Sequence, residues 1–161
     1  MNKQRLVILS TVCIALLAFA IWAAFTQYFN GAPDNKIVLR PNDAVVVAKG
    51  KSIYTSQCAA CHGDALQGQP NWQQRGPDGL LPAPPHDKDG HTWHHPDELL
   101  FRITKYGPGA LIQDPQYRSA MPVYEGLLTD AEIIAALSYI KSEWPEEIQA
   151  RHDAINDRMS K

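Results

Sequence analysis

Residues 6–25 form an uninterrupted run of twenty positions without a charged side chain, and only one serine and one threonine in the run are polar. As a helix, this run would be about 30 Å long at about 1.5 Å per residue, which matches the hydrocarbon core of a bilayer. Lys3 and Arg5 precede the run and favour the cytoplasmic side, which would place everything after it across the membrane. The run therefore predicts a single transmembrane anchor within residues 1–30.

A cleaved signal peptide is the alternative interpretation of the same run. The apolar region of a signal peptide spans roughly 7–15 residues and ends at a small-residue cleavage site. Here the run is longer, and its Ala-x-Ala triplet, residues 18–20, lies inside it. This length favours an uncleaved anchor, and a buried core helix fits less well because the run is apolar on every face. Both membrane interpretations place the later residues in the same compartment, outside the cytoplasm.

Charge and cysteine content narrow the function classes. The 161 residues carry a formal net charge of −2, and residues 31–161 carry −4 because two basic residues precede the run. Such a chain is not a strongly basic nucleic-acid binder, so no nucleic-acid partner is expected. Three cysteines are too few for a disulfide scaffold. One of them, Cys13, lies in the apolar run, where we expect an inert apolar role.

Beyond the run, the chain divides into a turn-rich tether over residues 31–41, a domain over 42–145 and a polar C-terminal helix or tail over 146–161. Three helices are expected in the domain: over residues 44–57, over residues 96–106, and from the Thr129-Asp130-Ala131-Glu132 capping box to the residue before Pro145. No alternating strand pattern stands out, so the fold class is expected to be all-α.

The segment between the first two helices, residues 63–95, has the composition of a loop. Together with Pro96 it holds half of the chain's twelve prolines. Loops of this length are uncommon in compact domains and usually serve a purpose. A domain of about 100 residues with a few short helices and such a loop buries little apolar surface. We therefore expect a group other than side chains to complete the core.

The sequence Cys58-Ala59-Ala60-Cys61-His62 indicates that this group is haem, because C-x-x-C-H is the attachment pattern of c-type haem. Two thiols on one turn can each bond a porphyrin vinyl group, and the adjacent His62 can then reach the iron as an axial ligand. A thioredoxin-like redox pair would need a βαβ context, and a structural zinc site would need four ligands at set spacing. One covalently attached haem c per chain is the prediction.

Two segments resemble the class I c-type cytochromes of bacteria. They are Gly50-x-x-x-Tyr54-x-x-x-Cys58-x-x-Cys61-His62-Gly63 and Met121-Pro122-x-Tyr124-x-x-x-Leu128-x-Asp130-x-Glu132-Ile133. The resemblance spans about residues 43–144. It implies a small cytochrome c fold of three to five helices around one covalent haem. It also implies that Gly50 and Tyr54 cross the last helix of the family fold, opposite Tyr139 and Trp144.

Met121 is the candidate for the second axial ligand of the iron. Of the three methionines, Met1 precedes the apolar run and Met159 lies in the polar tail. Met121 occupies a loop just before the capped last helix of the domain, and a thioether there would raise the reduction potential relative to bis-histidine ligation. A core-filling role is the alternative for Met121, and a histidine ligand is its rival.

Four histidines fall within ten residues of the long loop: His86, His91, His94 and His95. One interpretation is a secondary metal site for copper or zinc, built from two or three imidazoles and a nearby aspartate. The other is a structured loop along the haem edge, in which the rings bond backbone carbonyls or haem propionates. The second interpretation is favoured because the segment carries no further liganding motif.

Three further residues are candidates for contacts around the haem. The ring nitrogen that an axial histidine does not use for iron normally donates to a carbonyl oxygen. In the family a proline carbonyl accepts this bond, and the resemblance places Pro84, or its neighbour Pro85, in that role. Trp93 and Tyr124 are candidates for haem packing or for donating to a propionate, although aromatic side chains in small domains are more often plain core.

A six-coordinate iron and the resemblance together lead us to expect an electron carrier rather than an enzyme. The carrier would be a membrane-tethered monohaem cytochrome with His62 and Met121 as ligands, held by lipid through the apolar run. Its partners would be redox proteins, such as a cytochrome bc-type complex, a dehydrogenase or a terminal oxidase. The topology predicts a single pass through the bacterial inner membrane with the haem domain in the periplasm. The alternatives are a fixed haem subunit of a larger complex, or a sensor or peroxidase-like protein with an open sixth position.

Overall fold

The computed structural model describes residues 16–23, 36–112, 114 and 116–159. The chain divides into two compact units, one up to Lys36 and one from Ile37 onward. In the first unit, residues 16–23 are helical, and their apolar side chains, including Trp22, are exposed. Among the described residues, no helix is both long enough and apolar enough to cross a membrane. Most of the predicted anchor lies outside the described residues, so the anchor stays a prediction.

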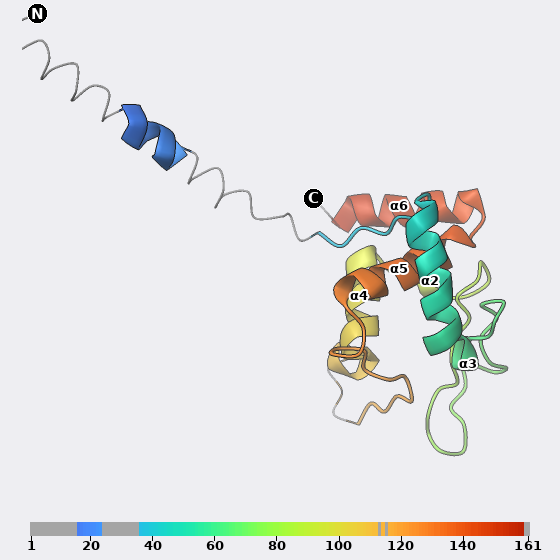
Figure 1. Cartoon of the computed structure of the whole chain (residues 1–161). Coiled ribbons are helices and arrows are strands. Elements are labelled where there is room, and N and C mark those ends of the chain that lie inside the picture. The colour runs from blue at the N-terminus through green and yellow to red at the C-terminus, as the bar shows by residue number, and fades with distance from the viewer. Residues whose placement is uncertain (1–15, 24–35, 113, 115, 160–161) are drawn as a thin grey trace, which may run out of the picture. The chain divides into compact units, whose positions relative to one another are not determined.

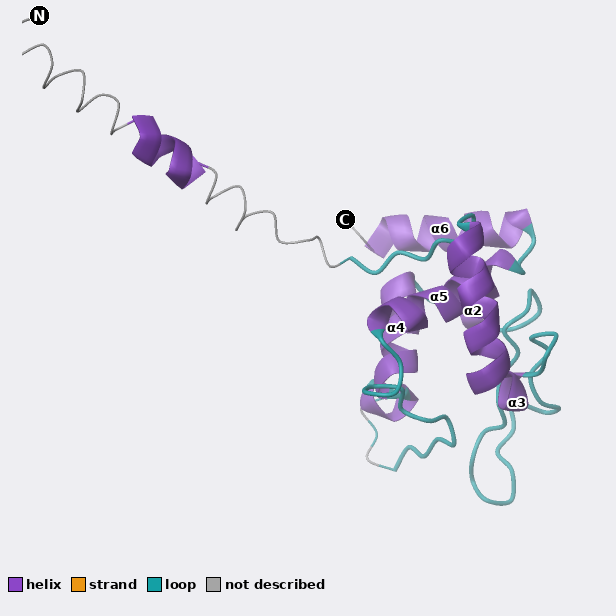
Figure 2. Cartoon of the chain, in the orientation of Figure 1, coloured by secondary structure: helices purple, strands orange, loops and turns teal. Residues whose placement is uncertain are grey.

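The second unit is built of helices and connecting loops (Figures 1 and 2). Its α-helices are α2 (Ala44–Gln57), α3 (Ala59–His62), α4 (Asp97–Tyr106), α5 (Asp130–Ser142) and α6 (Glu146–Met159), and its 3-10 helices are η1 (Thr92–His94) and η2 (Pro108–Ala110). Within the described residues, the only strand-like pairing is an isolated bridge between Glu125 and Leu128. The expectation of a mostly helical domain is confirmed.

Capping side chains explain where the two long core helices begin. The carboxylate of Asp43 accepts hydrogen bonds from the first amides of α2, which is why that helix starts at Ala44. At α5, the Thr129 hydroxyl and the Glu132 carboxylate bond each other's backbone amides and form the predicted capping box. Helix α4 begins at Asp97, one residue later than expected, because Pro96 keeps an extended backbone and serves as the N-cap.

Helix α2 crosses α5 at Gly50. A Cβ built at this glycine would lie 2.6 Å from the carbonyl carbon of Ala135 and 2.9 Å from Cβ of Tyr139, so only glycine allows the two helices to come this close. One turn further along α2, the buried Tyr54 ring lies 5.4 Å from the Tyr139 ring. The helix pair therefore crosses where the resemblance implied for Gly50, Tyr54 and Tyr139, whereas Trp144 lies beyond the end of α5 and contacts His86 and His152.

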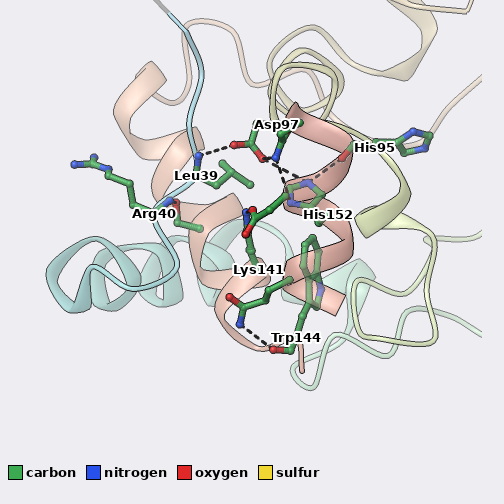
Figure 3. Close-up of polar contacts among 11 residues, drawn as sticks. Leu39, Arg40, His95, Asp97, Lys141, Trp144 and His152 are labelled. Atoms are coloured by element: carbon green, nitrogen blue, oxygen red, sulfur yellow. Dashed lines mark hydrogen bonds and ion pairs between the residues drawn. The ribbon is translucent and has the colours of Figure 1, made fainter. Parts of the chain in front are cut away.

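The C-terminal helix α6 belongs to the same compact unit as the other helices, and buried polar contacts attach it there (Figure 3). Asp97, at the start of α4, accepts hydrogen bonds from the Leu39 amide at 2.8 Å and from the Asn156 side chain at 3.0 Å. His152, which is fully buried, bonds the His95 carbonyl at 2.9 Å and lies 3.4 Å from Asp97. Polar side chains of α6, Asn156 and His152, therefore attach this C-terminal segment to the domain.

Trp144 lies at the junction of α5 and α6. Its indole N–H donates to the carbonyl of His86 at 2.7 Å, and its ring lies edge-on to His152 at 5.1 Å. Only 3% of Trp144 is exposed. This side chain joins α6 to the long loop that follows α3.

Candidate functional site

The two cysteines and the histidine of the motif lie on one turn at the end of α2. Cys58 ends α2 with its amide bonded to the Tyr54 carbonyl, and it also caps the short helix α3. Gly63 then stops α3 with a φ of 82°, in the left-handed region that favours glycine. Both thiols are free, with Cys58 partly buried and Cys61 exposed. Burial raises the pKa of the Cys58 thiol to about 11, so the free thiol is protonated at neutral pH.

The imidazole of His62 is buried and held by one backbone oxygen. Its Nδ1 lies 2.8 Å from the carbonyl oxygen of Pro84, which can only accept, so Nδ1 carries the proton. Burial lowers the pKa of the ring, and the Pro84 bond opposes that shift without reversing it. A neutral ring with a protonated Nδ1 leaves the lone pair of Nε2 for a metal.

The loop that supplies Pro84 lies in close contact with the motif turn, which is the turn formed by Cys58 to His62. Gly68 donates its amide to the His62 carbonyl at 2.8 Å, and a Cβ built at Gly68 would lie 2.6 Å from the carbonyl carbon of Pro84. The φ of Gly68 is 65°, which few other residues tolerate. This close approach of two backbone segments fixes where the Pro84 oxygen lies relative to His62.

Two buried tyrosines tie the ends of the motif turn. The Tyr54 hydroxyl donates to the Gly63 carbonyl at 2.8 Å, and the Tyr124 hydroxyl donates to the Gln57 carbonyl at 2.7 Å. Burial raises the pKa of Tyr54 and raises that of Tyr124 to about 12, so both remain proton donors. Tyr124 was a candidate for packing or propionate contacts, but its hydroxyl is used by the backbone. Sequence reasoning missed both bonds, because their partners are carbonyls that carry no sequence signal.

Met121 is half-buried and packs against the hydrophobic core. Its amide donates to the Ser119 hydroxyl at 3.0 Å. A few residues later, the amides of Tyr124 and Glu125 both donate to the Lys105 carbonyl at the end of α4. The methionine loop, the segment from Met121 to the start of α5, is therefore attached to α4 by backbone bonds and to the end of α2 through Tyr124.

Apolar surface lies exposed in the long loop and in the methionine loop. A cavity of about 380 Å³ is lined by Leu80, Leu81, Pro82 and Ala120, the neighbour of Met121, together with Gln69, Gly76, Pro77 and Asp78 of the long loop. Val123, in the methionine loop, is 50% exposed. Two free thiols and a neutral imidazole with an available Nε2 make up the donor set that a covalently attached haem needs, and the loops on either side in the sequence supply apolar surface.

The structure separates His86 from the other three loop histidines, whose rings lie close together, with His91 4.6 Å from His95 and 5.6 Å from His94 between ring centroids. His86 stacks on His62, with ring centroids 4.0 Å apart and planes 21° from parallel. His91 and His95 face each other through their Nε2 atoms at 2.9 Å, and His94 stacks on Trp93. Among the described residues, no three histidine, cysteine or carboxylate side chains gather where they could hold a metal ion.

Trp93, a candidate for haem packing or for a propionate contact, lies in the same loop. Its indole N–H donates to the Lys88 carbonyl at 3.1 Å, and one face of its ring is covered by His94 at 3.7 Å. Part of the side chain packs against the core. These contacts stabilise the loop, and a contact of Trp93 with haem stays a prediction.

Comparison with known proteins agrees with this arrangement. The family model described as Cytochrome c matches residues 47–144. The chain therefore belongs to the cytochrome c family, whose members carry covalently bound haem c and transfer electrons. The predicted family and cofactor are confirmed.

One relative adds a more particular likeness. A thiosulfate dehydrogenase of Stutzerimonas stutzeri (strain A1501) is 35% identical over 148 residues, which cover 86% of this chain and 42% of that protein. The chain thus spans about two fifths of the length of the curated relative that it matches. No solved structure gives a significant match.

Proposed function

We propose that this chain is a membrane-tethered monohaem cytochrome c with His62 and Met121 as axial ligands. It would carry electrons between a respiratory complex or dehydrogenase and a terminal oxidase, on the periplasmic face of a bacterial inner membrane. The observation that carries the proposal is the bond from His62 Nδ1 to the Pro84 carbonyl, on a turn that also holds two free thiols. That bond leaves Nε2 of a neutral ring available to iron.

Haem c, when bound, supplies one-electron exchange between ferric and ferrous iron. Cys58 and Cys61 would hold it through thioether bonds, and His62 would face the iron in an orientation that the Pro84 bond limits. Met121 would provide the opposite ligand from a loop attached to two helices. If His62 and Met121 both bind the iron, it would offer no position to a substrate, which suits a carrier.

Replacing Met121 by alanine tests the ligand assignment. We expect the variant to lose the weak red-edge absorption band that marks methionine bonded to ferric haem iron, and its midpoint potential to fall. Met159→Ala is the matched control, because Met159 is 73% exposed at the end of α6. An unchanged band and potential in Met121→Ala would refute methionine ligation. A high-spin spectrum of the unaltered protein would point instead to an open sixth position.

The tether is tested on the full-length chain in membranes. We expect the full chain to stay with the membrane after an alkaline wash, and a chain lacking residues 1–30, exported by a cleavable signal, to be released. Mass measurement of the extracted protein reports the intact N-terminus and one covalent haem together. Release of the full chain by the wash, or a mass that corresponds to cleavage, would refute the anchor.

A fixed haem subunit of a larger complex is the second candidate function, and the likeness to a thiosulfate dehydrogenase favours it. In this case the chain would accept electrons from a catalytic partner. We expect mild detergent extraction to leave a stable complex if this candidate is right, and the haem protein alone if the carrier is right. Anaerobic addition of thiosulfate to the oxidised, isolated protein tests a third possibility. Reduction of the haem would show that the chain oxidises thiosulfate by itself.

A further inference from the structure

The long loop touches the His62 ring at two places. The Pro84 carbonyl accepts a hydrogen bond from Nδ1 at the ring edge, and His86, two residues later, covers a ring face. The two imidazoles are nearly parallel, with centroids 4.0 Å apart and planes inclined by 21°. Stacked aromatic rings at this separation attract each other, and a ring held from its edge and its face has little room to rotate or tilt.

His86 is itself fixed by three hydrogen bonds. Its amide donates to the Leu66 carbonyl at 2.7 Å, and its carbonyl accepts from the Trp144 indole at 2.7 Å. Its ring Nδ1 lies 2.6 Å from the hydroxyl of Thr92, a buried residue. Backbone and ring are therefore both held, and the stacked arrangement does not depend on the chance rotamer of a free side chain.

The Trp144 bond extends this support to α6. Trp144 packs edge-on to the buried His152 of that helix. The family match ends at residue 144, so α6 lies beyond it. A continuous set of contacts thus runs from α6 through Trp144 and His86 to His62.

We infer that His86 is a positioning residue for the axial histidine: it sets the orientation of the His62 imidazole plane over the haem and favours the oxidised state. This inference rests on the proposed function, in which His62 is bound to iron. The plane of an axial imidazole determines how its π orbitals overlap with those of the iron, so rotating it changes the magnetic anisotropy of ferric haem. The π face of a stacked aromatic ring is electron-rich and stabilises the more positive His62 ring of a ferric complex.

The test compares His86→Leu with His86→Phe in the purified holoprotein. Leucine removes the stacked ring, whereas phenylalanine keeps a ring of similar shape. The readouts are the g-values of the ferric protein, the spread of its haem methyl NMR shifts and the midpoint potential. We expect His86→Leu to change the g-values and the methyl spread and to raise the potential. We expect His86→Phe to stay near the unaltered protein in g-values and methyl spread.

Two further variants make the comparison specific. His94→Leu makes the same chemical change in the same loop, on an exposed ring that stacks on Trp93, and should alter none of the readouts. Thr92→Val removes the hydroxyl that holds the His86 ring, and it should shift the readouts in the direction of His86→Leu by a smaller amount. If His86→Leu fails to fold with haem, Thr92→Val against His94→Leu still decides the question.

The inference is overturned if His86→Leu, or Thr92→Val in its place, leaves the g-values, methyl spread and potential unchanged. Equal changes in the leucine and phenylalanine variants would also overturn it, because they would trace the effect to the ring nitrogens and not to stacking. Failure of the proposed function is a separate result: the unaltered ferric protein would then lack the low-spin spectrum of an iron with an axial histidine and a second protein ligand.

Discussion

Replacing Gly50 by alanine should destabilise the domain, although alanine is the better helix former. The added methyl group would lie 2.6 Å from the Ala135 carbonyl carbon and 2.9 Å from Tyr139 Cβ, and closer still to the Ala135 carbonyl oxygen. Carbon atoms in contact lie about 3.5–4.0 Å apart, so α2 and α5 must separate by about 1 Å at their crossing. No flexible side-chain end is available to give way, because the neighbouring atoms belong to backbone or to a Cβ.

The magnitude follows from two opposing effects. Glycine to alanine within a helix contributes about 1 kcal/mol of stability through backbone entropy. Overpacking a close-packed contact costs about 1–3 kcal/mol, and the upper end applies here because separating the helices also loosens the contact of Tyr54 with Tyr139. The net loss should be about 2 kcal/mol, which corresponds to a melting temperature lower by roughly 8 °C for a domain of this size.

The assay is guanidinium unfolding of the holoprotein, followed by far-ultraviolet circular dichroism and by haem absorption. Gly109→Ala is the control: the same methyl group there would meet only a Tyr117 ring carbon, at 3.9 Å, an ordinary contact. We expect the control to match the unaltered protein within about 0.5 kcal/mol. A Gly50→Ala protein as stable as the unaltered one would refute the reasoning, since it would mean that the two helices can part without loss.

Three further predictions concern the caps and the attachment of α6. Thr129→Ala removes the side-chain cap of α5 and should lower the unfolding free energy by about 1 kcal/mol in the same denaturation assay. Asp97→Ala leaves the buried Leu39 amide and the Asn156 side-chain amide of α6 without their acceptor. We expect the unfolding free energy to fall by about 3 kcal/mol and proteolysis within α6 to become faster. Unchanged protease resistance would contradict this expectation. Burial, with help from the Lys141 charge, lowers the pKa of His152 below its ordinary value of 6.5, while Asp97 and Asp153 oppose the shift. The unfolded chain therefore takes up the proton first, so this contribution is complete above about pH 7 and is lost as the pH falls through and below the ordinary histidine pKa of 6.5. Unfolding midpoints of His152→Gln should vary less over this range than those of the unaltered protein.

Local rules predicted the parts of the fold that depend on neighbouring residues. The motif turn, the start of α2 at Asp43 and the capping box at Thr129 each follow from side chains a few positions apart. The crossing at Gly50 was available only through resemblance, because a glycine within a helix does not by itself indicate which helix it meets. The attachment of α6 was not predicted at all, since its contacts join residues far apart in the sequence and its composition is polar.

The loop histidines show why a cluster in sequence does not by itself predict a metal site. His86 is drawn toward the core by its backbone bond to the Leu66 carbonyl and by the Thr92 hydroxyl. The other three histidines lie in or beside η1, where His91 and His94 are exposed. Ten residues are long enough for a chain to turn from the core to the surface, so the four histidines do not form one set of ligands that could hold a metal ion within the described residues.

The groups that place the haem-binding turn are also core residues, so fold stability and site geometry cannot vary independently here. Tyr54 shows this most directly: only 1% of it is exposed, its ring packs on Tyr139 of α5, and its hydroxyl holds the end of the motif turn at Gly63. A change that moves α5 must therefore move the turn that carries His62. Because Trp144 fixes both α6 and the His86 backbone, displacement of α6 also reaches the face of the His62 ring. A thin core completed by a cofactor requires this sharing, because few side chains remain to hold the fold and the site separately.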